Sequence, residues 1–499
     1  MKIKIILAII FGLLGITSIF KNIEAQNSSS EWTSPEQLFL VTDGLRSNYL
    51  SVITDQADIV YSWWSTFRAD PNDLSVSEPK SRIFHSQNIT GDWRSPNDVM
   101  IWPDAGRMIS VLIDIEGMLH AFSATDCLNY TTAGYDQALS ARGWTNIGCL
   151  DEVGLAFPSA VQTLDGAFYV LYSSADNQSY RLIQSNDGGS TWSAYKTVLE
   201  IQDNFLLGPM LAVDQKDRLH LVWSIGQAPD AYPPIGVYYS RSDDGGKSWI
   251  PPVQLGGRDE GEPAIVVNND EVHVLWNGDV NKSGRYYRYS PDAGETWSAI
   301  EVLSPPSSQG GNGGLQRPPA IILDNVGNVH VLLHEEDALY FRTKTNTGWT
   351  AKQALYNPEV MKGVEIFGVR LAITGGNTIH AFYILETYDF SKDEDRNNHI
   401  WRVFHQTREI DADVAAPIPW PVQTNGEVSV VSQTDENPQI NQSISQNVLE
   451  FSDPGIGDQA DLRQNNPSTP FFWGSLSVVL FLGFVILIFS ISKMRFNRR

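Results

Sequence analysis

Charged side chains stand next to apolar segments at several widely separated places in the sequence. Arg107, Glu262 and Arg317 each come shortly before an apolar run, whereas Arg68 and Asp70 follow one. Arginine is permanently charged and can bind a planar carboxylate through two parallel hydrogen bonds. If the fold gathers these residues at one place, they could capture a ligand that carries a carboxylate.

Regularly spaced histidines suggest a second chemistry, metal binding. They are His120, His220, His273, His330 and His380. Each belongs to a different copy of a repeat, so a ring of copies would keep them apart, and packing between copies is the favoured role. The acidic stretch from Asp389 to Asp395 is better explained as a solvated run of charge, and no zinc-type Cys/His spacing occurs. We therefore expect no metal and no cofactor.

The elements that position these residues come from that repeat. An apolar strand, often begun by Pro and ended by Asp or Asn, leads through a turn into an apolar stretch that contains His or Tyr. The seven copies centre on Tyr61, His120, Tyr169, His220, His273, His330 and His380, which are 49 to 59 residues apart. Most copies continue with a Tyr- and Arg-rich strand and then a Trp before a fourth strand. This period predicts an all-β protein, a β-propeller of seven four-stranded blades, with six blades as the alternative.

The two ends of the repeat region complement each other. The seventh copy has a third strand near 399–405 but no convincing fourth strand after it. The segment from Trp32 to Leu38 is similar to the fourth-strand segment from Trp249 to Leu255. We therefore predict that the strand near 32–41 pairs with the strand near 399–405 and closes the ring, which removes two open sheet edges.

Three turns share the pattern Ser-x-Asp-x-Gly-x-(Thr/Ser)-Trp. Their aspartates are Asp187, Asp244 and Asp292, and their tryptophans are Trp192, Trp249 and Trp297. The pattern resembles the Asp boxes of sialidases and related bacterial-neuraminidase-repeat propellers, and the resemblance covers about residues 31 to 410. In such a box, Asp accepts backbone N–H bonds, Gly permits positive φ and Trp packs beneath. The resemblance places these hairpins opposite the catalytic mouth, so they indicate the fold rather than the activity.

The same resemblance suggests roles for the charged residues. A sialidase holds the sugar carboxylate with three arginines, and it uses a Tyr nucleophile assisted by Glu and an Asp as acid/base. Arg317 is similar to the first family arginine, although it lies in the sixth copy, and Arg107 holds the same position in the second copy. Glu262 resembles the family glutamate, whereas Arg68 and Asp70 resemble an arginine followed by the acid/base Asp.

The sequence also departs from the sialidase pattern. No Arg-Ile-Pro motif opens the domain, no Arg follows the strand that ends at Trp276, and no Tyr stands out as the nucleophile. We therefore favour a propeller that binds a glycan or protein ligand at its mouth. The alternative is an exo-glycosidase of sialidase type that cleaves terminal sialic-acid-like sugars. A third hypothesis is an envelope assembly scaffold.

Composition excludes one class of partner. The formal net charge of the chain is −23, and residues 26–491 alone carry 28 basic and 57 acidic residues. A body this acidic repels phosphate backbones, so nucleic-acid binding is not expected.

The two ends of the chain resemble targeting segments. Residues 1–25 combine Lys2 and Lys4 with a short apolar run, which predicts a signal peptide, with an uncleaved N-terminal anchor as the alternative. After the propeller at 26–410, residues 411–470 predict a flexible acidic stalk. Residues 471–491 are uncharged and long enough to span a membrane, and a buried helix is the weaker alternative. The basic tail 492–499 then lies in the cytoplasm and the propeller outside.

The chain has two cysteines, Cys127 and Cys149. An exported protein meets an oxidising compartment, so a single disulfide between them is expected. Two free, buried thiols are the alternative.

Overall fold

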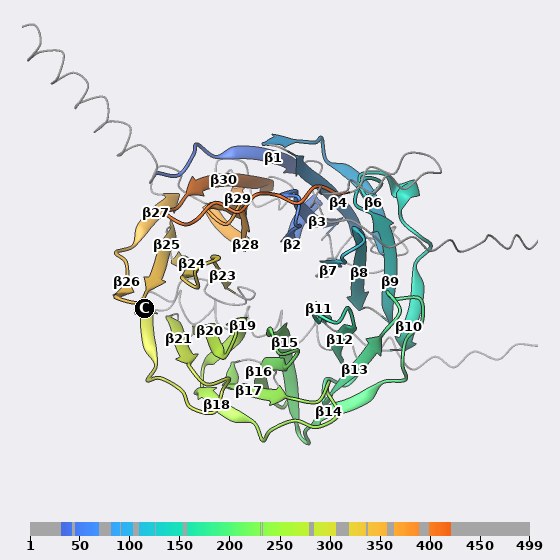
Figure 1. Ribbon diagram of the computed structural model, residues 1–499, viewed down its shortest axis with the longest axis vertical. Helices are drawn as coiled ribbons and strands as arrows, with labels where there is room; N and C mark the ends of the chain where they lie inside the picture. The colour runs from blue at the N-terminus through green and yellow to red at the C-terminus, as the bar shows by residue number, and fades with distance from the viewer. Residues whose placement is uncertain are drawn as a thin grey trace, which may run out of the picture. The chain divides into compact units, whose positions relative to one another are not determined.

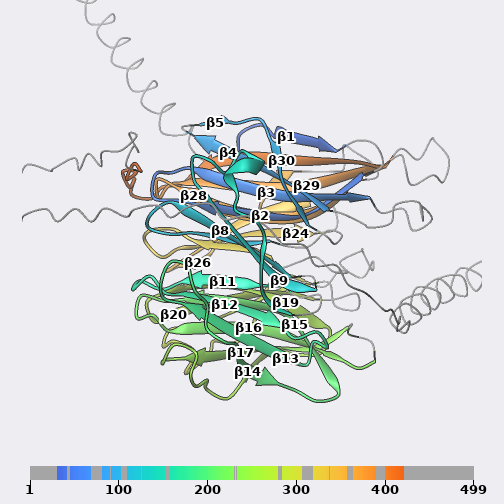
Figure 2. The ribbon, with the colours of Figure 1, turned by 90° about the vertical axis from the view of Figure 1, so that its right-hand side faces the viewer.

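The structure is a computed structural model, and it describes residues 31–41, 45–68, 81–89, 91–102, 109–124, 126–152, 157–229, 231, 233–278, 284–305, 319–335, 338–356, 364–388 and 399–420. Its thirty strands form seven antiparallel sheets. The sheets surround a common axis, so the predicted seven-bladed all-β propeller is confirmed (Figure 1). Strands of all blades run between the same two ends of the ring (Figure 2).

The first four blades follow the chain in order. Blade 1 comprises β2 (Leu45–Thr54), β3 (Val60–Arg68), β4 (Ser81–Ile89), β5 (Asp92–Trp93) and β6 (Asn97–Trp102). Blade 2 comprises β7 (Ser110–Ile113), β8 (Met118–Ala124), β9 (Cys127–Gly134) and β10 (Gly148–Glu152), with the short 3-10 helix η1 (Ala141–Gly143) before β10. Blade 3 comprises β11 (Ser159–Gln162), β12 (Phe168–Ser173), β13 (Ser179–Ser185) and β14 (Lys196–Glu200). Blade 4 comprises β15 (Asn204–Val213), β16 (Leu219–Gln227), β17 (Pro234–Ser242) and β18 (Val253–Gly256).

The last three blades complete the ring. Blade 5 comprises β19 (Glu260–Asn268), β20 (Glu271–Gly278), β21 (Arg285–Ser290) and β22 (Glu301–Ser304). Blade 6 comprises β23 (Ala320–Leu323), β24 (Val329–Glu335), β25 (Ala338–Thr345), β26 (Gly348–Trp349) and β27 (Gln353–Tyr356). Blade 7 comprises β28 (Val364–Thr374), β29 (Thr378–Tyr388), β30 (His399–Glu409) and the N-terminal strand β1 (Glu36–Val41).

The N-terminal strand closes the ring as predicted. β1 pairs antiparallel with β30, from Glu36 opposite His405 to Val41 opposite Trp401. A further backbone hydrogen bond joins Thr33 N to Thr407 O. Blade 7 is therefore built from both ends of the repeat region, which leaves no open edge between the first and last blades.

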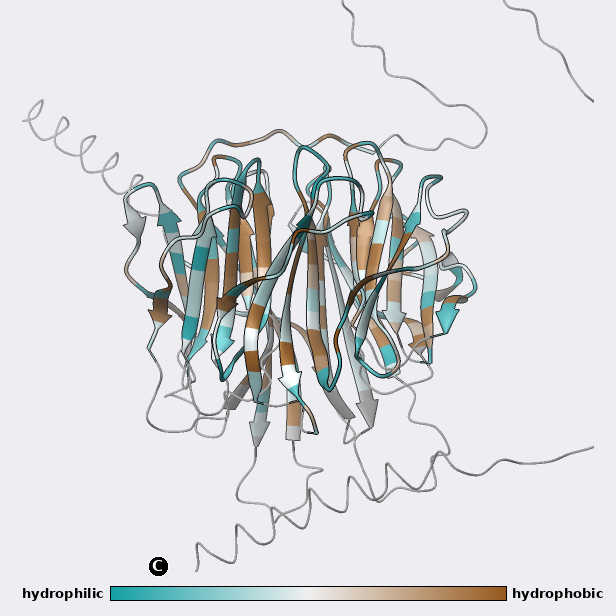
Figure 3. Ribbon diagram, turned by 90° about the horizontal axis from the view of Figure 1, so that it is seen from below, coloured by the Kyte–Doolittle hydropathy of each residue, from teal (hydrophilic) through white to brown (hydrophobic). Residues whose placement is uncertain are grey.

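The apolar core lies between neighbouring blades, because the buried faces of two sheets pack together. One such cluster joins Tyr169 and Leu171 of blade 3 to Leu211 and Trp223 of blade 4. Hydrophobic residues concentrate along the strands (Figure 3). This packing fixes the angle between blades and so positions the strand ends that face the axis.

A latch that recurs in several blades explains the repeated histidines. In blade 4, Asp214 Oδ1 accepts from Lys216 N and Arg218 N, and His220 Nε2 lies 3.1 Å from Asp214 Oδ2. His220 Nδ1 in turn bonds the hydroxyl of Tyr239 at 2.8 Å. Burial works against ionisation of Asp214, but the hydrogen bonds outweigh it and hold its pKa below the ordinary value.

The same contacts recur around His120 with Asp114, and around His330 with Asp324. The histidines therefore stay inside their blades as hydrogen-bonded latches, a role that the expectation of simple packing missed. Among the described residues, no group of three or more His, Cys, Asp and Glu could hold a metal ion. The acidic stretch at 389–395 lies outside them.

The three box hairpins lie at the same end of the ring as the latches, which we call the Asp-box end. Asp244 Oδ1 accepts from Ser248 N at 2.9 Å and Oδ2 accepts from the Ser248 hydroxyl at 2.6 Å. Equivalent bonds tie Asp187 to Thr191 and Asp292 to Thr296. The tryptophans pack on neighbouring strands, as Trp192 does against rings of blades 2 and 3. The other end of the ring, where the innermost strands begin, is the mouth.

Residues 411–420, which the sequence assigned to the stalk, lie against the Asp-box end. Ala415 N donates to Gly375 O, and Ile418 N donates to Gln56 O. Trp420 is 7% exposed, stacks on Tyr135 and donates its indole N–H to Asp55 at 2.7 Å. The packed region therefore extends ten residues beyond the predicted boundary at 410, because Trp420 buries its ring and satisfies its N–H there.

The predicted targeting segments at 1–25, 471–491 and 492–499 lie outside the described residues, as does the rest of the stalk. Within the described ranges, no helix is long and apolar enough to cross a membrane. Cys127 and Cys149 are joined by a disulfide with 5.5 Å between their Cα atoms, as predicted.

Candidate functional site

The structure describes only part of the predicted mouth. Glu262 lies in β19, close to its first residue, and Arg68 is the last residue of β3. Since β3 runs antiparallel to the innermost strand β2, Arg68 and Glu262 belong to the same end of the ring. Arg107, Arg317 and Asp70 lie outside the described residues. The box tryptophans are at the opposite end.

Glu262 sits in a bulge that recurs in four blades. The pairing between the first two strands shifts register at the same level in β2, β15, β19 and β28. At that level a residue of positive φ occurs in each: Tyr49, Gly208, Glu262 and Gly368. In two of the four blades this residue is glycine, which adopts a positive φ without steric cost. Glu262 (φ 52°) keeps a side chain there at a cost of roughly 1 kcal/mol.

Neighbouring side chains hold this bulge in place. Ser224 Oγ of blade 4 accepts from Glu262 N at 2.9 Å, so the bulge is tied to the preceding blade. Glu260 is 3% exposed, and its Oε2 accepts from Trp276 Nε1 and Gly257 N. The Glu260 contacts fix the start of β19, and the half-buried Glu262 side chain is thereby held at the mouth.

Arg285 is a charged residue at a position that is apolar in the other blades. It opens the third strand of blade 5 opposite Asn277. The equivalent residues of the other six blades are Ile83, Leu128, Tyr180, Val237, Leu339 and Val403. Arg285 is 4% exposed, and burial lowers its pKa to about 10, against the opposing effect of Glu335 and Glu262. It remains charged at neutral pH.

Two carboxylates therefore share the field of one buried guanidinium. Glu335 ends the second strand of blade 6, and its Oε1 accepts from the Ser304 hydroxyl and from Lys352 Nζ. The Glu335 side chain is 25% exposed and that of Glu262 is half-buried, so both can meet a ligand. Arg285 itself is too buried for that, so its role is to place a positive charge beside the two carboxylates.

An uncharged imidazole belongs to the same group. Burial, and then the charge of Arg285, lowers the pKa of His334 to about 3. His334 is therefore neutral at physiological pH and can offer one donor and one acceptor. The group at the seam of blades 5 and 6 thus combines a cation, two anions and a neutral base.

Deeper in the ring, the innermost strands line a central channel of about 260 Å³. Strand pairing identifies seven equivalent positions one level inside the bulge: Ser51, Ser110, Ser159, Met210, Ala264, Ala320 and Arg370. All seven line the channel, and Arg370 is the one charged residue among the described residues that do so.

The serines of this ring have a structural role. Ser110 Oγ accepts from Ala160 N and Ser159 Oγ accepts from Leu211 N, each joining one blade to the next. The Ser51 hydroxyl donates to Ile109 O in the same way. Arg370 instead bonds within its own strand, where its Nη1 donates to Val369 O at 2.7 Å. Its guanidinium adds a positive charge to a channel lined by apolar and hydroxyl groups.

Sequence analysis missed Arg285, Glu335, His334 and Arg370. None of them lies in a family motif, and none directly precedes a Pro-containing strand start. The available signal was the repeat itself, because alignment of the seven copies shows Arg, Glu or His at positions that are mostly apolar or small elsewhere.

Comparison with known proteins agrees with the architecture. Residues 158–357 match the family model of the BNR repeat-like domain. The fold is that of a sialidase-like, BNR-repeat propeller. No curated protein sequence matches the chain significantly.

Several solved structures align with part of the chain. The polysaccharide lyase Uly1 aligns with a TM-score of 0.46 at 11% identity, over 73% of this chain and 90% of that chain. A PL25 ulvan lyase bound to -[GlcA(1-4)Rha3S]- gives 0.46 at 12%, over 70% and 93%. The Hadza microbial sialidase Hz136 gives 0.40 at 12%, over 71% and 77%.

Proposed function

We propose that the mouth of this BNR-repeat propeller binds a glycan through an acidic sugar. Arg370 binds the sugar carboxylate at the top of the channel, and Glu262 and Glu335 accept hydrogen bonds from sugar hydroxyls. The supporting observation is the break in the sevenfold repeat, since Arg370 and the Glu262–Arg285–Glu335 group put charge where other blades have apolar or small residues. A guanidinium in a partly desolvated channel attracts a carboxylate strongly. The predicted arginines at 68, 107 and 317 would add to this attraction.

Hydrolysis of such a sugar is the second candidate. The observation that favours it is the positive φ of Glu262, because backbone strain of this kind clusters at active sites. Glu262, or Asp70 beyond the described residues, would then act as acid or base, and the neutral His334 could donate or accept a hydrogen bond beside it. Tyr49 holds the equivalent bulge position in blade 1 and is the tyrosine we would test first as nucleophile.

We also propose that the propeller is exported and anchored by the segment at 471–491. The sequence of both ends supports this, and a disulfide between Cys127 and Cys149 is typical of an oxidising compartment. External protease should release the propeller from intact cells. Protection of the propeller in intact cells would contradict the proposal.

The test of the mouth uses full-length protein in detergent, titrated calorimetrically with N-acetylneuraminic acid and glucuronic acid. Arg370→Ala should weaken binding of the preferred sugar at least tenfold, and Arg370→Lys should restore part of it because the charge returns without the bidentate geometry. Equal affinity in the Ala variant, or no binding of either acid, would refute the proposal. A fluorogenic sialoside decides the second candidate: cleavage that is lost in Glu262→Gln supports hydrolysis, and its absence supports binding alone.

A further inference from the structure

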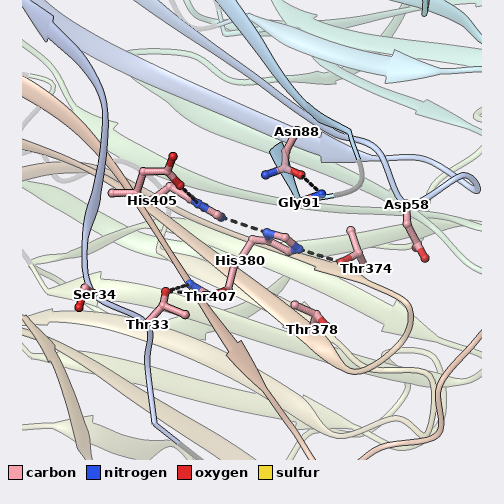
Figure 4. Close-up of a pocket in the computed structure, with 11 residues that line it drawn as sticks. Thr33, Ser34, Asp58, Asn88, Gly91, Thr374, Thr378, His380, His405 and Thr407 are labelled. Carbon is pink, nitrogen blue, oxygen red and sulfur yellow. Dashed lines mark hydrogen bonds and ion pairs between the residues drawn. The ribbon is translucent and has the colours of Figure 1, made fainter. Parts of the chain in front are cut away.

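A second polar cavity lies at the Asp-box end, where blade 7 with its N-terminal strand meets blade 1. We call this place the closure seam. The cavity has a volume of about 470 Å³, within the range of roughly 300–1,000 Å³ that small-molecule sites occupy. Its lining comes from the segment before β1, the hairpin of blade 1 and the inner turn of blade 7 (Figure 4).

At this seam, other residues replace two of the three members of the Asp–His–Tyr latch. Thr374 stands where blades 2, 4 and 6 have an aspartate, and His405 stands where blades 2, 4 and 5 have a tyrosine. Trp93 Nε1 donates to His405 Nδ1 at 3.0 Å, and an indole N–H can only donate. His405 must therefore carry its proton on Nε2, which donates to His380 Nδ1 at 3.0 Å. His380 Nε2 then donates to the Thr374 hydroxyl at 2.8 Å.

Figure 4 draws the contacts from His405 to His380 and from His380 to Thr374; with the bond from Trp93, all four imidazole nitrogens are used. Glu36 Oε2 lies 3.6 Å from His405 Nδ1. Both rings are buried, and burial lowers the pKa of His380 to about 4 and of His405 to about 3. The rings therefore form a neutral floor that neither coordinates a metal nor attracts an anion while the relay is intact. The polar groups left to meet a ligand belong to the walls and the rim.

Those groups are hydroxyls, an amide and carboxylates. Threonine and serine side chains supply the hydroxyls, and Asn88 is 6% exposed, with its Oδ1 accepting from Gly91 N, so its NH₂ group is the part that can donate to a ligand. The charged residues of the lining are Glu36 and Asp58, and no lysine or arginine is among them. Asp58 Oδ1 accepts from Gly375 N at 2.7 Å, which orients the carboxylate. A site of this kind suits many ligand hydroxyls and a positive charge, and it repels anions.

We propose that the closure seam binds a hexose-sized sugar that is neutral or carries an amine. The proposal is independent of the proposed function at the mouth, because the two sites lie at opposite ends of the ring and prefer opposite charges. Such a ligand would contact β1 and blade 1 at once, so its binding would also hold the ring closed.

The test uses saturation-transfer NMR on the full-length protein with three probes: glucosamine, methyl β-galactoside and N-acetylneuraminic acid. Glucosamine and methyl galactoside should show transfer that Ser34→Trp abolishes, since Ser34 is exposed on the rim and a Trp there fills the entrance. Ser190→Trp, at an exposed serine in a blade 3 hairpin of the same end, is the matched control and should keep the signal. Thermal denaturation checks that both variants fold.

Charge selectivity provides the second arm. Asp58→Asn keeps the shape and the bond to Gly375, and asparagine tolerates the φ of 60° at this position. It should weaken glucosamine about tenfold and leave methyl galactoside within twofold. Absence of transfer to both sugars, or transfer that persists in Ser34→Trp, would overturn the proposal. Transfer to N-acetylneuraminic acid that only Arg370→Ala removes belongs to the mouth and supports the separation of the two sites.

Discussion

At the Asp-box end of the propeller, Asp114, Asp214 and Asp324 each hold two turn N–H groups and one histidine in the same way. At the mouth, Arg285 and Arg370 have no counterpart of their own type in any other blade. Repeated contacts stabilise each blade and its neighbour, so they are found in every blade that has the same turn to stabilise. Residues that occur once serve no shared structural need, and the function that we propose for the mouth rests on them.

Acid should have the largest effect on stability, because it titrates buried histidines of the Asp-box end together with His334 of the mouth. Burial lowers the pKa of His273 and His380 to about 4 and of His405 to about 3, against about 6.5 in an unfolded chain. Between pH 6.5 and about 4 the unfolded state binds protons that the native state does not, so stability falls as pH falls. Each histidine contributes up to about 1.4 kcal/mol per pH unit, and several act together.

Urea unfolding of the full-length protein at pH 7, 6 and 5 measures this loss. His273→Gln removes one titrating group from the Asp-box end and should flatten the profile by the share of one histidine. A profile that is already flat in the unaltered protein would contradict the burial of these rings. Carboxylates of lowered pKa, such as Asp214, would add to the loss only near and below pH 4.

The latch itself should be the most sensitive single contact. The Asp214 carboxylate is fully buried, and Asp214→Ala leaves His220 Nε2 and two backbone N–H groups without their acceptor, while Arg218 keeps its bond to Asp270. Breaking such a buried pair costs roughly 3–5 kcal/mol in the free energy of unfolding. At the mouth, Glu262→Gln should change the free energy of unfolding by less than about 0.5 kcal/mol.

Asp214→Asn is the matched control, because blade 5 carries Asn268 at the equivalent position. It keeps an acceptor for the turn and should cost less than the alanine change. If Asp214→Ala and Glu262→Gln prove equally mild, the distinction between a structural end and a functional end fails.

The disulfide is a third stabilising device, and it lies at the start of β9, in blade 2. It closes a loop of 22 residues, and reduction should lower the free energy of unfolding by ~3 kcal/mol through chain entropy. Denaturation with and without reductant measures the effect, and the double change of Cys127 and Cys149 to Ser should abolish the dependence on reductant. Two free thiols in the unreduced, unfolded protein would rule the bond out.

The features predicted from the sequence are those that repeat from blade to blade, and the residues that were missed occur in one blade each. The period of the copies, the box turns and the N-terminal strand were sufficient for the ring and its closure, because each signal occurs more than once or has a matching partner. The latch histidines were noticed, but their hydrogen bonds to Asp214 and its equivalents require strand register. Arg285 and Arg370 had no motif to mark them, and their significance depends on which blades come together around the axis. Trp420 was assigned to the stalk because residues 411–470 as a whole are rich in Asn, Gln, Ser, Asp and Pro and show no sustained periodicity.

The smallest expected effect tests the origin of the strain at the mouth. Glu262→Gly places at the bulge the residue type that blades 4 and 7 use there, as Gly208 and Gly368. Relief of the positive φ should offset the extra freedom of glycine in the unfolded chain, so stability should stay level or rise by up to about 1 kcal/mol. Binding of the acidic sugar should nevertheless weaken, since the carboxylate is gone.

Gly208→Ala is the reverse experiment. A Cβ at this position would meet no atom within 4 Å, so the expected cost of about 1 kcal/mol is that of the backbone conformation alone. Urea unfolding of both variants measures the pair, and a Glu262→Gly protein that loses more than about 1 kcal/mol would show that this side chain holds the ring together rather than serving a ligand.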